Sequence, residues 1–300
     1  MTKSILITGG NGFIARSLFE SFTNSYFSPL EPNVVSLNRD DLDLLDTTKV
    51  SEYLKDNYFD VVIHTATHDA VPEFTGKKHS DVLDVNLKMF FNLAHCSDYF
   101  GKMLYFGSGA ETGRENWKPR MTEDYIEGCV PDDPYGNSKY LMNKYTVKSN
   151  NIYNLRLFGL FGKFDDWRYR FISNACCKAV LGMPITLKKD AIFDYLYISD
   201  LIEIVKWFME NSPRQHSYNI CTGETTSYMS LAAEVIAMSG KKLEIAIEDG
   251  GRGVEYSGDN SRFLKEHGNF RFTPMREAIS YLYQWYLKNK SIIKQEDFLY

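Results

Sequence analysis

Short apolar runs alternate with helical patterns along the first half of this chain, and this alternation restricts its fold more than any other feature. The runs typical of buried strands are residues 5–8, 34–37, 61–65, 103–108 and 154–157. The helical patterns between them are residues 12–23, 48–58, 80–100 and 134–148. Strands that alternate with helices form a parallel sheet with helices on both faces, so the sequence predicts an α/β fold.

The pattern changes after Phe158. Helices are predicted for residues 170–181, 200–211, 227–239 and 275–288. Strands are predicted for residues 185–187, 194–198, 217–220 and 243–247, and the last of these leads into a glycine-rich loop, "EDGGRG". We interpret this half as a smaller α/β lid whose segments are interleaved with the sheet.

Composition and charge argue against several classes of function. A net charge of −5 does not favour a nucleic acid or an anionic membrane as a partner. No stretch approaches the roughly 20 apolar residues of a membrane-spanning helix, and the first apolar run is far too short for a secretory signal, so we expect a cytoplasmic protein. The five cysteines form no C-x-x-C pair and no His/Asp/Glu cluster has metal spacing, so neither disulfides nor a metal site is predicted.

Small residues follow the first strand in "ILITGGNGFIARSLFESF". Gly9, Gly12 and Ala15 have the spacing of a turn that lets the backbone approach a pyrophosphate and packs a helix closely on a strand. The amino terminus of that helix offers N–H groups and a positive dipole end to phosphates. The motif therefore favours a dinucleotide site, while a plain strand-to-helix turn is the alternative.

Tyr135 and Lys139 in "PYGNSK" lie four residues apart, which places them on one face of a predicted helix. A tyrosine with a pKa near 10 transfers protons poorly at neutral pH, and a neighbouring ammonium lowers that pKa toward the working range. Ser108 ends the strand "KMLYFGS", where its hydroxyl can bond the carbonyl oxygen that Tyr135 protonates. A chance Tyr-x-x-x-Lys pair and an ordinary turn serine are the alternatives.

Together these motifs resemble the extended short-chain dehydrogenases/reductases, which include nucleotide-sugar epimerases, dehydratases and 4-ketosugar reductases. The matching segments cover most of the chain in the family's order: "TGGNGFIA", "VVIHTAT", "VNLKMFFNLAHCSDYFGKMLYFGSG", "DDPYGNSK", "RLFGLFG", "FDYLYISDL" and "YNICTGETTSYMSLAAEV". The resemblance implies a Rossmann-type doubly wound sheet with a smaller, interleaved substrate-binding domain. It implies a dinucleotide-binding domain at residues 1–160, to which 194–221 return, and a substrate-binding lid at 161–193 and 222–300.

The resemblance also implies roles for individual residues. Ser108, Tyr135 and Lys139 become the catalytic triad, in which Lys139 also contacts the nicotinamide ribose. The implied cofactor-binding residues are Gly9, Asn11, Gly12, Phe13, Ile14, Asn38, Arg39, Asp43, Leu44, Thr65, Ala66, Thr67, Tyr135 and Lys139. The implied substrate-binding residues are His68, Gly109, Ala110, Arg170 and Arg252. A loop position for His68 and solvated surface charges for the two arginines are the alternatives, and His64 is interpreted as a core or strand-end histidine.

The cofactor prediction depends on the end of the second strand, "VVSLNRDDLDLLD". An acidic residue directly after this strand favours NAD, whereas here Asn38 and Arg39 come first, and a guanidinium suits the 2′-phosphate of NADP. The segment also resembles that of GDP-fucose synthase-type reductases, which use NADPH. We therefore predict NADP, with NAD as the alternative because Asp40 and Asp41 are adjacent.

Two departures from the family bear on the reaction. Its 4,6-dehydratases place Asp-Glu directly after the catalytic hydroxyl residue, where this chain has Gly109 and Ala110, so dehydration is not expected. The Asn and Arg that hold the substrate diphosphate in the family fall on Gly159 and Phe193, which leaves the identity of the substrate open.

Three functions are therefore compared. The first is an NAD(P)-dependent oxidoreductase that reduces a 4-keto nucleotide sugar in deoxysugar or surface-polysaccharide biosynthesis, with the proton from Tyr135. The second is a nucleotide-sugar 4-epimerase with retained NAD. The third is a nucleotide-binding sensor without turnover, which the intact triad disfavours. The family further implies a homodimer through the helices at 80–100 and 134–148, although their apolar faces also fit a plain core.

Overall fold

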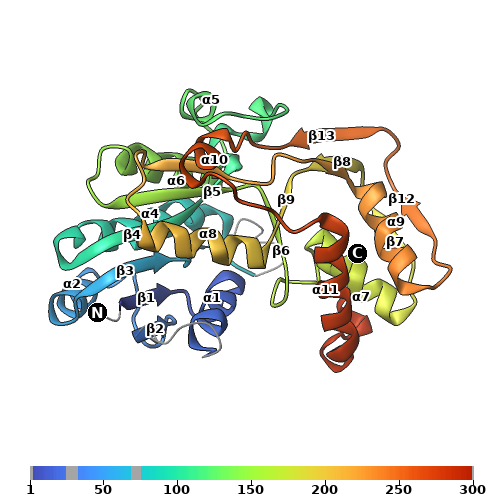
Figure 1. Ribbon diagram of the computed structural model, residues 1–300, viewed down its shortest axis with the longest axis horizontal. Coiled ribbons are helices and arrows are strands. Elements are labelled where there is room, and N and C mark those ends of the chain that lie inside the picture. Colours follow the sequence, from blue (N-terminus) through green and yellow to red (C-terminus); the bar gives the residue numbers. More distant parts are fainter. Residues whose placement is uncertain (1–2, 25–32, 69–75, 299–300) are drawn as a thin grey trace.

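The computed structural model describes residues 3–24, 33–68 and 76–298 (Figure 1). Within these residues the main sheet has six parallel strands: β1 (Ser4–Thr8), β2 (Asn33–Leu37), β3 (Phe59–His64), β4 (Phe100–Ser108), β5 (Ile152–Leu157) and β10 (Ser217–Ile220). Their order is β10-β5-β4-β3-β1-β2. The direction of winding reverses between β1 and β3, and doubly wound sheets bind ligands at such a point, beyond the carboxyl ends of the strands. The predicted fold class is confirmed.

Helices cover both faces of this sheet because successive residues of a strand point to opposite sides. The helices α1 (Phe13–Thr23) and α8 (Ile198–Glu210) share one core with the sheet. The helices α2 (Thr47–Asp56), α4 (Val82–Ala94) and α6 (Pro134–Thr146) share the other. Ile5 and Ile7 of β1 belong to the first core and Leu6 belongs to the second, all three without exposed surface. Burial on both sides explains why these strands are continuous apolar runs in the sequence.

The lid has a core of its own. Its elements are β6 (Gly159–Phe161), α7 (Phe171–Leu181), β7 (Ile185–Leu187), β8 (Asp190–Phe193), β9 (Tyr195–Tyr197), β11 (Thr226–Ser227), α9 (Tyr228–Ser239), β12 (Ile245–Ile247), β13 (Arg252–Tyr256) and α11 (Met275–Lys288). Figure 1 shows α7, α9 and α11 together on the right of the view, and their buried side chains form one cluster. The predicted division, with the lid at residues 161–193 and 222–300, stays a prediction; Tyr195 of β9, which that division places in the dinucleotide-binding domain, belongs to the lid core.

Two helices of the described residues were not predicted, and one of them connects the lid segment to the sheet. The helix α10 (Ser261–His267) lies in the segment assigned to the lid, yet its Phe263 is buried in the core that α1 and α8 share with the sheet. The short helix α5 (Glu123–Glu127) is capped by the Thr122 side chain, which accepts a hydrogen bond from the Tyr125 N–H. The carboxyl-terminal segment therefore packs against both cores.

Other boundaries differ from the prediction because of contacts between distant segments. The helix predicted at 80–100 ends at Ala94, and β4 already begins at Phe100. The Asn151 side chain donates hydrogen bonds to the carbonyls of Ser97 (3.0 Å) and Phe100 (3.2 Å), which holds this stretch out of the helix. Among the described residues, none of the helices combines the length and the apolarity that crossing a bilayer requires.

Candidate active site

The turn between β1 and α1 requires glycine. Gly9 has φ +74°, and a Cβ there would lie 2.8 Å from the backbone N and Cα of Ala66. The Gly12 N–H donates to the Gly9 carbonyl at 2.8 Å and the Gly10 N–H donates to the Leu37 carbonyl at 2.9 Å, so the turn is tightly closed. A side chain at position 9 would be strained and would also collide with the loop that follows β3.

The amino terminus of α1 is exposed beside this turn. Gly12 is the N-cap residue of α1, and none of the described side chains caps that helix end. Asn11 and Gly12 are exposed, and Phe13 and Ile14 are partly buried. Uncapped N–H groups at a helix amino terminus, beside an exposed glycine turn, fit the pyrophosphate of a dinucleotide.

The predicted adenosine-binding residues follow β2. The Arg39 guanidinium is 76% exposed and lies 3.4 Å from a carboxylate oxygen of Asp43, a surface ion pair that contributes little to stability. The Asn38 side chain accepts a hydrogen bond from the Asp40 N–H at 2.7 Å and shapes the loop. Leu44 is different, because its side chain is buried in the core below α2. Arg39 is therefore an accessible cation at this end of the candidate site.

The loop after β3 is tied to α4 and α6 through Asn86. The His68 N–H donates to the Asn86 side-chain oxygen at 2.6 Å, and the Asn86 amide donates back to the His68 carbonyl at 3.2 Å. Asn86 is buried and also lies 3.4 Å from the Ser138 hydroxyl, which donates to the Tyr135 carbonyl at 2.7 Å. Sequence reasoning missed Asn86, which connects the predicted cofactor loop to α6, the helix of the predicted catalytic tyrosine.

Thr65, Ala66 and Thr67 lie in this same loop. The Thr65 hydroxyl donates to the Thr8 carbonyl at 2.7 Å, Ala66 packs its backbone against Gly9, and Thr67 is exposed. The interpretation of His64 is confirmed, because it is buried with its Nδ1 2.9 Å from the Thr8 hydroxyl. Burial, with the nearby charge of Lys139, lowers the pKa of His64 to about 3, so it stays neutral.

The helix α6 brings Tyr135 and Lys139 next to the carboxyl end of β4. Asp133 caps this helix by accepting a hydrogen bond from the Gly136 N–H at 2.8 Å. A Cβ on Gly136 would lie 2.4 Å from the Ala110 carbonyl, so only glycine permits the helix to approach the turn after Ser108 this closely. The glycine in "PYGNSK" thus brings the two parts of the predicted triad together.

Lys139 is almost completely buried, at 6% exposed. Its Nζ donates to the Phe106 carbonyl of β4 at 2.9 Å and lies 5.8 Å from the centroid of the Tyr135 ring. Burial lowers the pKa of Lys139 from 10.5 to about 8, and the negative charge of Glu111 opposes this shift. The amine is therefore charged at neutral pH and lies next to the phenol, as the predicted proton-transfer chemistry requires.

Ser108 begins a 3₁₀ turn, Gly109–Thr112, at the end of β4. Its hydroxyl accepts a hydrogen bond from the Ala110 N–H at 3.2 Å and lies 3.3 Å from the hydroxyl of Tyr256 in β13. The Ser108 N–H donates to a Glu111 carboxylate oxygen at 3.1 Å. Side-chain and backbone bonds together fix the position of this serine.

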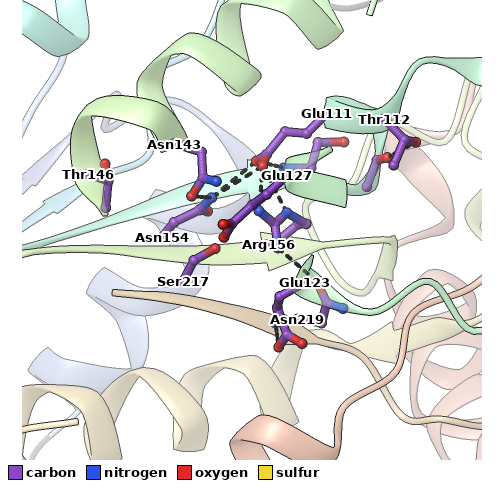
Figure 2. A network of polar contacts seen from close by, with 12 residues as sticks. Glu111, Thr112, Glu123, Glu127, Asn143, Thr146, Asn154, Arg156, Ser217 and Asn219 are labelled. Carbon is purple, nitrogen blue, oxygen red and sulfur yellow. Dashed lines mark hydrogen bonds and ion pairs between the residues drawn. The ribbon is translucent and has the colours of Figure 1, made fainter. Parts of the chain in front are cut away.

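Behind this turn, Glu111 and Arg156 form a fully buried ion pair (Figure 2). The Arg156 Nε and Nη2 lie 2.8 and 2.7 Å from the same carboxylate oxygen, and the Asn154 amide donates to the other at 3.1 Å. Arg156 Nη1 further donates to the Asn219 side chain at 3.0 Å, which links β5 to β10. Glu111 is thereby fully engaged, so it does not supply the carboxylate that is missing from Gly109 and Ala110.

Aromatic rings occupy the space beside Ser108. A Cβ on Gly109 would lie 2.6 Å from the Phe158 ring and 2.7 Å from the Tyr256 hydroxyl. We call the surrounding set of rings the aromatic wall; it consists of Trp117, Phe158, Phe193, Tyr228 and Tyr256. Ring centroids within it lie 4.2 to 5.4 Å apart, and Phe193 stacks on Tyr228 at 5.2 Å.

The two departures noted in the sequence are explained by packing against the lid. A Cβ on Gly159 would lie 2.6 Å from the Tyr195 ring, so the paired strands β6 and β9 leave no room for a larger residue. Phe193 forms part of the aromatic wall in place of a cation. This part of the candidate site therefore presents aromatic rings where the family pattern has a cation.

The predicted substrate arginines lie in the lid. Arg170 is the N-cap residue of α7, has a half-exposed side chain, and its Nε lies 4.0 Å from Asp165. Burial raises the pKa of Asp165 to about 7. Arg252 is the first residue of β13, and its side chain lies outside the described part of the structure.

A separate cleft of about 710 Å³ lies between α1, α8 and α11. Its lysines are paired with glutamates, Lys163 with Glu20 and Lys206 with Glu203, each at 2.7 Å. None of the predicted catalytic residues lines it. Within the described ranges, no group of three or more His, Cys, Asp or Glu side chains could hold a metal ion.

Solved structures with the same fold cover nearly the whole chain. A GDP-L-fucose synthetase from Naegleria fowleri is 19% identical, with a TM-score of 0.81 over 98% of this chain and 95% of that chain. A GDP-mannoheptose C4 reductase from Campylobacter jejuni, solved with NADP bound, is 21% identical, with a TM-score of 0.80 over 95% and 98%. A UDP-glucose 4-epimerase from Thermotoga maritima, solved with UDP-glucose, is 20% identical, with a TM-score of 0.78 over 97% and 100%.

The likeness to these structures concerns the fold, and the family follows from the sequence itself. The profile of the NAD dependent epimerase/dehydratase family matches residues 5–221, which is more than half of the chain. The matched range contains the glycine turn, Ser108, Tyr135 and Lys139. The chain therefore belongs to the NAD dependent epimerase/dehydratase family.

Proposed function

We propose that this protein is an NADP-dependent reductase that acts on the 4-keto group of a nucleotide-activated sugar. The observation that carries the proposal is the buried amine of Lys139, 5.8 Å from the Tyr135 ring and held at the carboxyl end of β4 beside Ser108. The relatives in fold include a fucose synthetase and two heptose reductases, one of them solved with NADP. A proton donor beside a dinucleotide site is the arrangement that carbonyl reduction needs.

The chain's own groups would divide the work as follows. Tyr135 donates a proton to the carbonyl oxygen, and the ammonium of Lys139 favours the phenolate that remains. The Ser108 hydroxyl bonds the same oxygen and orients it. A nicotinamide bound across the strand ends supplies the hydride. Gly9, Gly12 and the first N–H groups of α1 would hold its pyrophosphate, and Arg39 would hold the 2′-phosphate.

The sugar and its nucleotide would lie against the aromatic wall. Gly159 and Phe193 offer no charge to a diphosphate, so Arg170 and Arg252 are the cations that we assign to it. His68, Gly109 and Ala110 lie at the end of β3 and in the turn after β4, and we place them along the sugar. Glu111 is engaged with Arg156, which supports reduction over dehydration.

The cofactor and the reaction can be tested together. Native mass spectrometry of the purified protein reports bound NAD or NADP, and a panel of 4-keto nucleotide sugars is then assayed for oxidation of NADPH. We expect stoichiometric NADPH consumption. Tightly retained NAD with interconversion of 4-epimers and no net oxidation would instead establish the epimerase, a function that the UDP-glucose 4-epimerase fold relative also represents.

Replacing the tyrosine tests the triad. Tyr135→Phe removes the proton donor and keeps the ring, so turnover should fall by about 10²- to 10⁴-fold with an unchanged melting temperature and unchanged NADPH binding. Tyr58→Phe is the matched control, because Tyr58 is exposed and precedes β3, at the opposite end of the sheet. Full turnover by Tyr135→Phe on an identified substrate would refute the assignment.

We also propose a homodimer through α4 and α6. These two helices pack against each other on one face of the sheet, and Leu141 of α6 exposes apolar surface. Light scattering coupled to gel filtration should give twice the mass of the chain, and Leu141→Glu should reduce it to one chain. A monomeric wild-type protein would refute this arrangement.

A further inference from the structure

We propose that Tyr256 is a positioning residue that makes Ser108 a hydrogen-bond donor toward the substrate carbonyl. This inference rests on the proposed reductase function. Tyr256 ends β13, 148 positions away from Ser108 along the chain, and the two hydroxyl oxygens lie 3.3 Å apart. No spacing in the sequence connects the two residues.

The argument begins with the bonds that the Ser108 hydroxyl already makes. A hydroxyl has one proton to donate and two lone pairs that accept. One lone pair accepts the Ala110 N–H at 3.2 Å. If the Tyr256 hydroxyl donates to the second, both lone pairs are used, and the serine proton is left for a ligand.

Tyr256 is placed to be that donor. Its side chain is buried, at 5% exposed, and burial together with the nearby charge of Tyr135 raises the pKa of Tyr256 above its ordinary value. The phenol therefore keeps its proton at neutral pH. The Tyr256 hydroxyl therefore lies within hydrogen-bond distance of Ser108 and within the electrostatic reach of Tyr135.

The ring of Tyr256 is held rigidly. It packs against Trp117 at 4.2 Å and Phe158 at 5.1 Å between ring centroids. Its hydroxyl occupies the space where a side chain at position 109 would begin, since a Cβ on Gly109 would lie 2.7 Å away. Gly109 therefore makes room for this contact, which gives the missing carboxylate a structural reason.

The test is a double-mutant cycle with Tyr256→Phe, Ser108→Ala and the combination of both. Phenylalanine keeps the packing of the ring and removes only the hydroxyl, and Tyr58→Phe is the matched control. We expect Tyr256→Phe to lower kcat by about three- to tenfold with KM for NADPH unchanged, which is the effect of one hydrogen bond. In the Ser108→Ala background the same substitution should have no further effect, because it acts only through the serine.

A second measurement needs no substrate. The same four proteins are unfolded in urea, and the shifts of the midpoint should be non-additive if the two hydroxyls interact in the folded state. Additive midpoint shifts, full kcat in Tyr256→Phe, or losses of kcat that multiply in the double variant would each overturn the proposal. If the wild-type protein reduces no 4-keto sugar, the proposed function fails, while the unfolding cycle still decides whether the contact exists.

Discussion

Replacing Lys139 by methionine should remove most of the activity and leave the protein at least as stable at neutral pH. Methionine has a similar length and no charge. Turnover should fall by about 10²-fold or more, because the phenol loses the neighbouring ammonium that favours its ionised form. If this substitution disables the reaction without weakening the fold, Lys139 is present for its role in the reaction. Its burial as a charged amine then lowers the stability of the folded protein.

The magnitude follows from the burial of the amine. A pKa lowered from 10.5 to about 8 corresponds to roughly 3 kcal/mol by which the folded protein disfavours the charged amine. Methionine relieves this penalty but leaves the Phe106 carbonyl without its 2.9 Å bond, which costs about 1–3 kcal/mol. The two terms nearly cancel at neutral pH, so the stability there should change little or rise.

The pH dependence is the sharper readout. Because the folded-state pKa lies below the unfolded one, the unfolded chain binds more protons between about pH 8 and 10.5. The contribution of Lys139 to stability therefore improves as pH rises through that window, by up to about 3 kcal/mol. Urea unfolding of both proteins across this range should show the wild type gaining stability relative to Lys139→Met. A difference between the two that stays flat, or that falls with pH, would refute the reasoning.

Three further predictions concern other parts of the site. Gly9→Ala places a side chain at φ +74° against the Ala66 backbone. It should lower the free energy of unfolding in urea by about 1–3 kcal/mol or more and weaken NADPH binding measured by fluorescence. Unchanged stability would contradict the geometry. Arg39→Ala should raise KM for NADPH about tenfold and leave KM for NADH unchanged, and equal effects on both would exclude a 2′-phosphate contact. Arg156→Met leaves the buried carboxylate of Glu111 unpaired and should lower the free energy of unfolding by about 3–5 kcal/mol. Adding Glu111→Gln to the same chain should restore part of this loss. A stable single variant would show that the pair is dispensable.

The main sheet could be predicted from the sequence because its strands are buried on both faces. Residues such as Ile5, Leu6 and Ile7 have no exposed surface, so apolar side chains are required at consecutive positions, and the run is visible without any tertiary information. The helix at 80–100 was predicted too long for the opposite reason. The bonds from Asn151 that hold residues 97–100 out of the helix come from a distant loop.

The lid was predicted less completely because its strands are short and depend on one another. The strand β8 has only four residues, Asp190–Phe193, and lies between β11 and β13. The glycine-rich stretch predicted as a loop leads directly into β13, where Gly253 packs against Ala191 and a Cβ would lie 2.8 Å from its Cα. Glycine is needed at this position because two strands approach each other closely. No local sequence pattern distinguishes such a glycine from one in a turn.

The same contrast holds for the candidate site. Tyr135 with Lys139, and Gly9 with Gly12, are close in the sequence, so helix and turn geometry alone place each pair together. Asn86 and Tyr256 reach the site from α4 and β13, and their partners lie far away along the chain. Their contribution depends on the tertiary fold, which periodicity and spacing do not describe.

The ion pair between Glu111 and Arg156 has a practical consequence for genetic screens of this protein. The same carboxylate holds the backbone of Ser108 and adds its charge to the surroundings of Lys139, so a substitution there would impair folding and turnover at once. A screen that scores only loss of activity would rank position 111 with the predicted triad and label it catalytic. Measuring the amount of folded protein beside the activity of each variant would separate the supports of the site from the groups that react.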